Sequence, residues 1–347
     1  MSTQESVVAA PELVRRPGRG RRFWAAISPK RISAIYAFIV IFIVFAIWTP
    51  STFLSETTLR TILDQQAITA ILAIGLTVPL ASGVFDLSVG YTLGLSTILV
   101  SVMLTQWGVP IALAVLIAIL AGAVVGLVSG FIVTRLGVDS FITTLGMGSV
   151  AFALTLWLSN NQLIIGLPQP FQKIATTEIL GIQLPVYYMV ILALILWYVM
   201  AHTPAGRYFY AAGGNYEAAR LSGLPTQKIV VASLVIAGLM AGIAGTLLAG
   251  QSAAGSPSVA PQYLLPAFAA VFLGSTQFRS GTPNIWGTVI SVYVLATGVK
   301  GLQLVGAPFW IPDLFNGVVL IIAVALSKDQ RSSILRRFRR RPVAAAA

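Results

Sequence analysis

Ten apolar segments separated by short polar connections constrain this chain more than any other feature of its sequence. A helix of about 20 predominantly apolar residues spans a bilayer, and the shorter segments would need flanking residues to do so. Only 9% of the residues are charged, against about 25% in soluble domains. We therefore predict an all-α polytopic membrane protein of about ten transmembrane helices, and the eighth segment is the least clearly defined. The segments are Ile32 to Trp48, Ala67 to Ala81, Leu87 to Thr105, Pro110 to Thr134, Phe141 to Leu158, Val186 to Ala201, Ile229 to Gly250, Tyr263 to Leu273, Ile285 to Val299 and Trp310 to Leu326.

The distribution of lysine and arginine predicts the orientation of these helices. Ten spans put both termini on one side, and basic residues are retained in cytoplasmic connections. If the termini are cytoplasmic, only Arg60, Lys173 and Lys300 of the 22 basic residues lie outside. Removing the eighth span would export the basic cluster RRFRRR near the C-terminus. We therefore expect ten spans with both termini in the cytoplasm.

This topology divides the chain into three parts. Residues 1–31 are expected to form a basic cytoplasmic tail, because this stretch is polar and lacks the pattern of a cleavable signal peptide. Residues 32–327 form the predicted transmembrane domain, and residues 328–347 form a second basic cytoplasmic tail, with its end, Pro342 to Ala347, expected to be disordered. The long outer connection 159–185 contains GLPQPFQ and an apolar stretch around Leu180, and it is expected to carry a short interfacial helix.

The long inner connection 202–228 contains the polar sequence GGNYEAARLSG. Asn215 is a suitable N-cap for a helix, and the negative charge of Glu217 is favourable at the positive N-terminal end. Gly223 can adopt the left-handed conformation that ends a helix. We therefore predict a short helix from Tyr216 to Ser222. Glu217 and Arg220 are three residues apart and are expected either to pair with each other or to contact a soluble partner.

Asp86 is an isolated acid between apolar segments, with no basic residue between Arg60 and Arg135. A carboxylate in such a position marks a functional site by default. The alternative is a tight cytoplasmic turn in which its oxygen accepts from the backbone amide of Ser88 or Val89. Gly90 and Gly94 would thin the third helix, which is mild support for a pathway through the protein.

Small residues recur four apart on the fourth and seventh segments. Gly122, Gly126 and Gly130 form a double GxxxG, and Gly238 and Gly242 form another. Such faces let helix backbones approach closely in a bilayer. Packing inside the bundle is favoured over a dimer seam.

Several classes of function lack the residues they need. The chain has no cysteine and only His202 as histidine, so no metal site and no redox cofactor is expected. The basic residues sit in tails and connections rather than in a stripe, which argues against nucleic-acid binding. No GxxxxGK[ST] sequence occurs, so an energised transporter would take its ATPase from another subunit.

Three stretches together carry a family resemblance. GVFDLSVG at Gly83 to Gly90, GGN…AARLSG at Gly213 to Gly223 and AVFLGSTQF at Ala270 to Phe278 resemble the inner-membrane permeases of ABC-type monosaccharide importers, the ribose, xylose and galactose group. The likeness runs from about Thr57 to Lys328. The third stretch departs from the family, because it continues as GSTQFRSGTPN rather than with a glycine pair and a glycine-rich turn.

The resemblance implies a type II ABC importer-like permease in the inner membrane of a bacterial cell. It assigns coupling to the ATPase to residues of the short helix and its caps, and it makes the DLSVG stretch a candidate part of the translocation pathway. The coupling residues are Asn215, Glu217, Ala218, Ala219, Arg220, Leu221, Ser222 and Gly223, and the pathway candidates are Asp86, Ser88 and Gly90. The implied partners are an ABC ATPase subunit, a second permease copy in a homodimer or heterodimer, an extracytoplasmic substrate-binding protein and a small sugar.

Our interpretation is a transport subunit without enzymatic activity, whose dimer forms the pathway for a small monosaccharide. Importer permeases for autoinducer-2, cobalamin or branched-chain amino acids remain alternatives. An ion-coupled secondary transporter would need ionisable groups at the bilayer midplane, for which only Asp86 is available.

Overall fold

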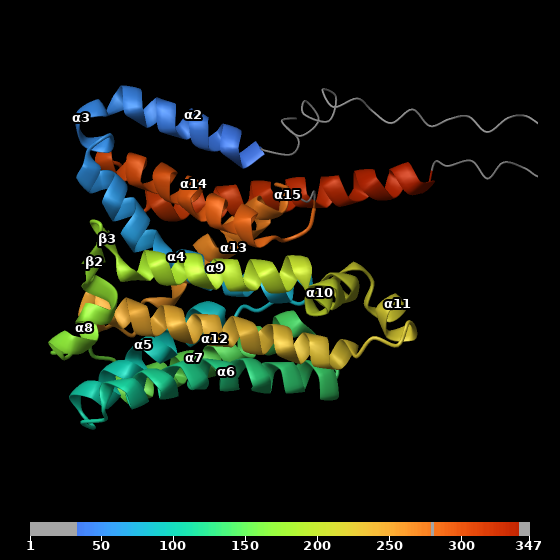
Figure 1. The fold of residues 1–347 in the computed structure, drawn as a ribbon, viewed down its shortest axis with the longest axis horizontal. Coiled ribbons are helices and arrows are strands. Elements are labelled where there is room, and N and C mark those ends of the chain that lie inside the picture. The colour runs from blue at the N-terminus through green and yellow to red at the C-terminus, as the bar shows by residue number, and fades with distance from the viewer. Residues whose placement is uncertain (1–32, 279–280, 340–347) are drawn as a thin grey trace, which may run out of the picture.

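A bundle of long, roughly parallel helices forms the protein in the computed structural model, which describes residues 33–278 and 281–339 (Figure 1). The long helices are α2 (Ser33–Trp48), α4 (Glu56–Ala81), α5 (Val89–Thr105), α6 (Ile111–Arg135), α7 (Ser140–Ser159), α9 (Leu184–His202), α12 (Thr226–Ser252), α13 (Ala260–Ser275), α14 (Ile285–Leu304) and α15 (Ile311–Arg339). Each of the ten predicted apolar segments overlaps one of them. The all-α prediction therefore holds for the described residues.

Not all of these helices are long enough to cross a membrane on their own. Within the described residues, α4, α6, α7, α9, α12 and α14 have the length and hydropathy of spans. The apolar parts of the other four long helices are shorter. The structure thus supports a multi-pass membrane protein, and the number of ten crossings stays a prediction.

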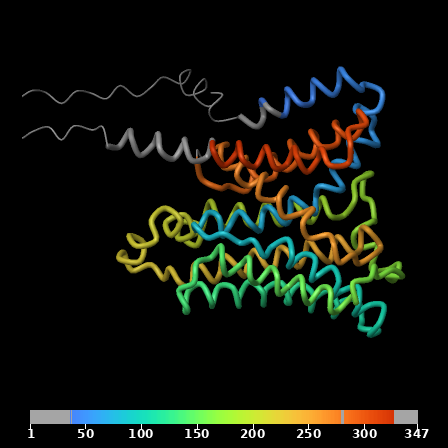
Figure 2. Tube along the Cα trace, turned by 180° about the vertical axis from the view of Figure 1, so that it is seen from behind, coloured from blue at the N-terminus to red at the C-terminus, as the bar shows by residue number. Residues whose placement is uncertain are grey.

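Short elements cap the two ends of the bundle (Figures 1 and 2). The helix α8 (Gln169–Thr176), the strands β2 (Glu178–Ile179) and β3 (Ile182–Gln183) and the helix α3 (Pro50–Phe53) lie at one end, which we call the α8 end. The strand β1 (Ile164–Ile165) pairs with β4 (Ala254–Gly255) in an antiparallel ladder. The helices α10 (Pro204–Gly214) and α11 (Tyr216–Leu221) lie at the opposite end, which we call the α11 end.

Three of the candidate membrane-spanning helices are largely buried in the bundle. In the most apolar window of α4, 78% of the residues are buried inside the protein, and the value for α12 and for α14 is 67%. The corresponding value is 22% for α9 and 28% for α6 and α7, whose apolar side chains face outward. In a bilayer this outward surface faces lipid, so α4, α12 and α14 belong to the core while α6, α7 and α9 cover it.

Glycines set the closest helix contacts within the chain. A β-carbon on Gly122 would collide with the carbonyl of Gly238, and one on Gly126 with the carbonyl of Leu234. Gly242 likewise faces the backbone of Ile119. The two glycine faces therefore pack on each other, α6 against α12, and the prediction of internal packing is confirmed.

The predicted boundaries need correction at both ends of the bundle. The helix α4 begins at Glu56 rather than Ala67, because Ser55 caps it by accepting from the amide of Thr58 at 3.2 Å. The outer connection has its helix at α8, whereas Leu180 and Gly181 form the two-residue turn of the β2–β3 hairpin with φ values of +54° and +74°. Two successive positive φ angles match the twist of a hairpin.

The inner connection and the C-terminal region also differ from expectation. The helix α10 was not predicted, although Pro204 at its first turn and the following small residues are compatible with a helix. The last helix, α15, runs to Arg339 and so passes the expected start of the C-terminal tail at residue 328. The predicted N-terminal tail and the segment Pro342 to Ala347 lie outside the described residues.

Candidate functional site

The short polar helix has the predicted local structure. α11 covers Tyr216–Leu221, one residue shorter than expected, and Asn215 Oδ1 accepts from the amide of Ala218 at 3.0 Å. Gly223 adopts φ +82° directly after the helix, as predicted. A glycine there avoids the steric cost that other residues meet at positive φ.

One face of α11 packs on the protein and the other is open. Ala219 is buried, whereas the side chain of Leu221 is 83% exposed. Arg220 and Glu217 form an ion pair at 3.0 Å, with both side chains exposed. The pair matches the first of the two expectations for these residues, and exposed pairs of this kind contribute little to stability.

The preceding helix α10 joins α11 to the centre of the bundle. Gly213 lies against the carbonyl of Ala81 at the end of α4, and a β-carbon on Gly83 would lie 3.1 Å from the Cα of Gly213. Tyr210 donates its hydroxyl to the carbonyl of Pro283, just before α14, at 2.9 Å. α10 therefore touches the end of α4 and the connection directly before α14.

Asp86 lies in the connection between α4 and α5, near this junction, and is buried. Its Oδ1 accepts from the backbone N–H of Ser88 at 3.0 Å and from the Ser88 hydroxyl at 2.6 Å. This is the hydrogen bond to the Ser88 amide that the tight-turn alternative predicts. Burial raises the pKa of the Asp86 carboxyl to about 6, and the two hydrogen bonds from Ser88 oppose the shift.

Gly90, in the first turn of α5, marks a close helix contact. A β-carbon there would lie 2.9 Å from the carbonyl oxygen of Ala260 and 2.9 Å from Cβ of Leu264, both on α13. Gly90 thus lets α5 approach α13. None of the three pathway candidates, Asp86, Ser88 and Gly90, lines the large cavity described next.

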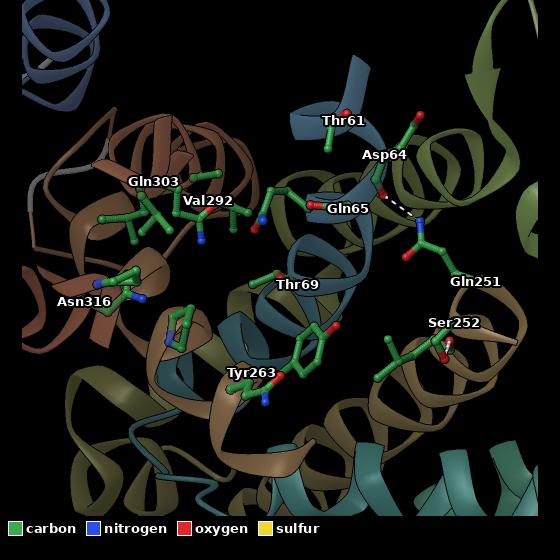
Figure 3. A pocket seen from close by; sticks show the side chains of 18 of the residues that line it. Thr61, Asp64, Gln65, Thr69, Gln251, Ser252, Tyr263, Val292, Gln303 and Asn316 are labelled. Atoms are coloured by element: carbon green, nitrogen blue, oxygen red, sulfur yellow. Dashed lines mark hydrogen bonds between the residues drawn. The ribbon is translucent and has the colours of Figure 1, made fainter. Parts of the chain in front are cut away.

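A large polar cavity of the protein was not predicted from its sequence. A cavity of about 680 Å³ opens in the α8 half of the bundle, between α4, α12, α13, α14 and the start of α15 (Figure 3). Six glutamines and an asparagine contribute to its wall: Gln65, Gln66, Gln183, Gln251, Gln262, Gln303 and Asn316. Its volume lies in the range of pockets for small molecules.

Hydrogen bonds hold one side of the cavity in place. The backbone N–H of Gln183 donates to Asp64 Oδ1 at 3.0 Å. Gln251 Nε2 donates to the backbone carbonyl of Asp64 at 3.2 Å and to Gln183 Oε1 at 2.9 Å. Figure 3 shows Gln251 of α12 facing Asp64, while Gln65 extends from α4 toward α14. The bonded residues tie α4, the hairpin and α12 together around the opening.

The opposite side of the cavity keeps an unpaired polar atom. Asn316 of α15 is 9% exposed, and its Oδ1 accepts no hydrogen bond from the described residues. Tyr263 of α13 adds an aromatic ring to the lining. Amide, hydroxyl and aromatic groups of this kind can bind a neutral solute that carries many hydroxyl groups, because each amide both donates and accepts.

The charges of the lining restrict the solute further. Asp64 and Asp313 are the ionisable carboxylates in the wall, and no lysine, arginine or histidine is found among the described residues that form it. A carboxylate or phosphate group on a solute would therefore meet negative charge without a cationic partner. The cavity is suited to an uncharged polar molecule.

A signal for this cavity exists in the sequence. Gln183, Gln251, Gln262 and Gln303 each stand beside an apolar segment, and the ten-span topology puts all four at the same edge of the membrane. Asp64 and Gln65 were assigned to a connection because they precede the apolar part of α4. The polar stretch is in fact the first half of that helix.

Comparison with known proteins decides the family. The family described as the branched-chain amino acid transport system / permease component matches residues 58–324. The chain belongs to this permease family. Its resemblance to importer permeases, drawn from three short stretches, is thereby confirmed, and the protein is a transport subunit rather than an enzyme.

Several curated proteins are similar to this permease over most of their length. The ribose import permease protein RbsC of Bacillus subtilis (strain 168) is 35% identical over 303 residues, which cover 87% of this chain and 94% of the relative. The L-arabinose ABC transporter permease protein AraH of Azospirillum brasilense is 28% identical over 93% of this chain and 94% of the relative. The autoinducer 2 import system permease protein LsrD of Yersinia enterocolitica is 31% identical over 73% of this chain and 78% of the relative. No solved structure matches the permease.

Proposed function

We propose that this permease forms the membrane pathway of an ATP-driven importer for a neutral monosaccharide, in the inner membrane of a bacterial cell. The observation that carries the proposal is the cavity lined by amides and hydroxyls without a cationic side chain. A sugar offers hydroxyl groups that both donate and accept, so each lining amide can be satisfied. Relatives named for ribose and L-arabinose support the same class of solute.

The family description also raises branched-chain amino acids as solutes. At neutral pH such a solute is a zwitterion, and Asp64 or Asp313 could pair with its ammonium group. Its carboxylate, which binding sites generally pair with a cation or several backbone amides, finds no cationic side chain in the described lining. The cavity therefore favours a sugar over an amino acid. Autoinducer-2 is the second candidate, because one relative is named for it and it is a small polar molecule.

Orientation follows from the basic residues. Arg135, Arg207, Arg220 and Lys228 lie at or near the α11 end, and basic residues are retained in cytoplasmic connections. We infer that α11 lies in the cytoplasm and that the cavity opens toward the outside. An extracytoplasmic binding protein would deliver the sugar there, and the ATPase would bind at α11. A second permease copy would complete the transporter.

Helices that run from the α11 end to the cavity suggest how the ATPase is coupled to transport. α10 touches the end of α4 and the connection directly before α14, and both helices line the cavity further along their length. A displacement of α10 and α11 by the ATPase would therefore be carried to the cavity wall along rigid helices. The assignment of Asn215 to Gly223 to coupling rests on this connection, and the role of Asp86, Ser88 and Gly90 in the pathway stays a proposal.

The proposal is tested by uptake in cells that lack their own importers for D-ribose, L-arabinose, D-allose and L-leucine. The permease, with candidate ATPase and binding-protein partners, should take up radiolabelled D-ribose, L-arabinose or D-allose in a manner that depends on ATP hydrolysis. Radiolabelled L-leucine should not enter. Leucine uptake, or sugar uptake by the permease alone in liposomes under an ion gradient, would refute the proposal.

A further inference from the structure

A second group of polar side chains is buried inside the bundle, separate from the large cavity. Thr77 of α4, Thr288 and Ser291 of α14, and Gln277 just after α13 are each 0% exposed. We call these four residues the inner cluster. They lie toward the α11 ends of their helices, and none of them lines the large cavity. Burying apolar residues at these positions would cost less desolvation free energy, so the presence of four polar side chains needs an explanation.

The hydroxyl groups of the two threonines in the inner cluster have more possible hydrogen-bond acceptors than they have hydrogens to donate. Their hydroxyl oxygens are 3.1 Å apart. Thr77 also reaches the carbonyl of Ala73 at 2.8 Å, and Thr288 reaches the carbonyl of Asn284 at 2.9 Å. Each hydroxyl carries a single hydrogen, so these three hydrogen bonds cannot all form at once. The pair can therefore accept a hydrogen bond from a solute hydroxyl.

Gln277 has an unpaired amide atom. Its Nε2 donates to Ser291 Oγ at 3.2 Å, whereas its buried Oε1 accepts no hydrogen bond from the described residues. Exchanging the two amide atoms would move the unpaired position from oxygen to nitrogen without removing it. A buried group in this state is unfavourable unless a ligand satisfies it at some stage.

Helix periodicity aligns the inner cluster with the large cavity. On α13, Tyr263 of the cavity and Ala270 are seven residues apart and share one face, and Gln277 lies seven residues further along the chain, two residues past the end of the helix. On α4, Thr69 of the cavity and Thr77 are eight residues apart, which is about 12 Å along the axis.

Small or apolar residues separate the cavity from the cluster on two of the helices. Ala73 of α4 and Ala270 of α13 are buried in the main hydrophobic core. On α14 the apolar Val292, which lines the cavity, follows directly after Ser291 of the cluster. The helices α4, α13 and α14 pack on one another. On α4 and α13 an apolar stretch therefore lies between the polar residues of the cavity and the inner cluster.

We propose that the inner cluster is a second binding site for the hydroxyl groups of the solute, separated from the outer cavity by an apolar neck that is closed in this conformation. The inference rests on the proposed function as a sugar permease. A sugar hydroxyl donates to Gln277 Oε1 or to the threonine pair, and another accepts from the cluster. Tyr210 of α10 binds the carbonyl of Pro283, next to the start of α14, so movement of α10 acts close to this site.

Gln277→Met tests the site, because methionine keeps the length of the side chain and removes its hydrogen-bonding groups. In the uptake assay with D-ribose, the maximal rate should fall about fivefold to tenfold, as expected for the loss of about one hydrogen bond to the solute. The half-saturating concentration should stay unchanged, because the outer cavity is intact. The matched control is Thr143→Val, which removes another buried unpaired hydroxyl, on α7 away from the cluster. Its uptake should equal that of the wild type.

Three results would count against the inference. An unchanged maximal rate in Gln277→Met refutes it, and so does a loss of rate that follows a matching loss of melting temperature, which would indicate that the cluster only pins α13 to α14. Absence of D-ribose, L-arabinose and D-allose uptake by the wild type would refute the proposed function, and this inference with it. Uptake by wild type and variant alike would refute the inference alone.

Thiol labelling provides a measurement that does not depend on the rate of transport. The native chain has no cysteine, so Ser291→Cys introduces a single reactive site. A small membrane-permeant methanethiosulfonate should label it during ATP turnover with sugar present and not in the resting protein. The matched control is Ser129→Cys, which is equally buried on α6. Equal labelling of the two sites in every state, or no labelling of Ser291→Cys during turnover, would overturn the proposal.

Discussion

Leu221 provides the sharpest test of the coupling role of α11. Its side chain is 83% exposed, while Ala219 of the same short helix is buried against the protein. Full burial of a leucine stabilises by about 1.5–3 kcal/mol, and alanine retains part of this. If Leu221 inserts into a groove of the ATPase, Leu221→Ala should cost about 1–2 kcal/mol of binding free energy, or roughly a fivefold to thirtyfold rise in the dissociation constant.

The assay titrates the purified ATPase subunit onto the permease held in lipid nanodiscs. The variant should fold normally, because Leu221 makes little contact within the chain. Leu180→Ala is the matched control, since Leu180 is 91% exposed at the opposite end of the bundle and should leave ATPase binding unchanged. Coupled sugar uptake should fall in Leu221→Ala at limiting ATPase and recover at excess.

Two outcomes would refute this reasoning. A dissociation constant that is the same in Leu221→Ala and wild type means that α11 does not insert this side chain into the partner. An equal loss of binding in Leu221→Ala and Leu180→Ala means that the effect is general rather than local to α11.

Three further predictions concern the cavity, the buried acid and the glycine contacts. Asn316→Leu removes an unpaired acceptor from the outer cavity and should raise the half-saturating D-ribose concentration about fivefold to tenfold without lowering the maximal uptake rate; a change in maximal rate alone would contradict this. The pKa of Asp86 is raised from 3.8 to about 6, so the folded protein holds this proton more tightly and the resulting stability is lost as the pH rises from about 4 to about 6. Asp86→Asn should therefore raise the melting temperature at pH 7 but not at pH 4, and equal shifts at the two pH values would contradict the assignment. Gly126→Leu should abolish folded protein in detergent, measured by size-exclusion chromatography, because its side chain would collide with the carbonyl of Leu234. Gly146→Leu, whose glycine has no neighbour within 4 Å, is the control that should fold.

These predictions also separate stability from transport. Asp86 sits in a hydrogen-bonded turn and its ionised form is disfavoured by burial, so the neutral asparagine should be tolerated by the fold. A loss of uptake in a stable Asp86→Asn protein would then point to a role of the carboxylate itself. Undiminished uptake would leave Asp86 with its structural role.

Local sequence determined most of the secondary structure of this protein. Long apolar runs form helices because a bilayer leaves no other partner for their backbone groups, and basic residues orient them. Local interactions also determine the ends of α11, since the Asn215 side chain and the left-handed conformation at Gly223 act within a few residues. Such features can be inferred from one stretch of chain at a time.

Tertiary structure decided which faces meet. The glycines on α6 and α12 indicate close packing in the sequence, but only the fold shows that Gly126 meets the backbone of α12 rather than a second copy. The cavity is equally non-local, because Asp64, Gln183 and Gln251 come from separate elements and converge through hydrogen bonds. Polar residues in the first half of α4 hid this part of the helix from the hydropathy pattern. They are polar because that face of α4 lines the cavity. Sequence patterns report the environment of each residue separately, whereas a binding site depends on how several helices pack together.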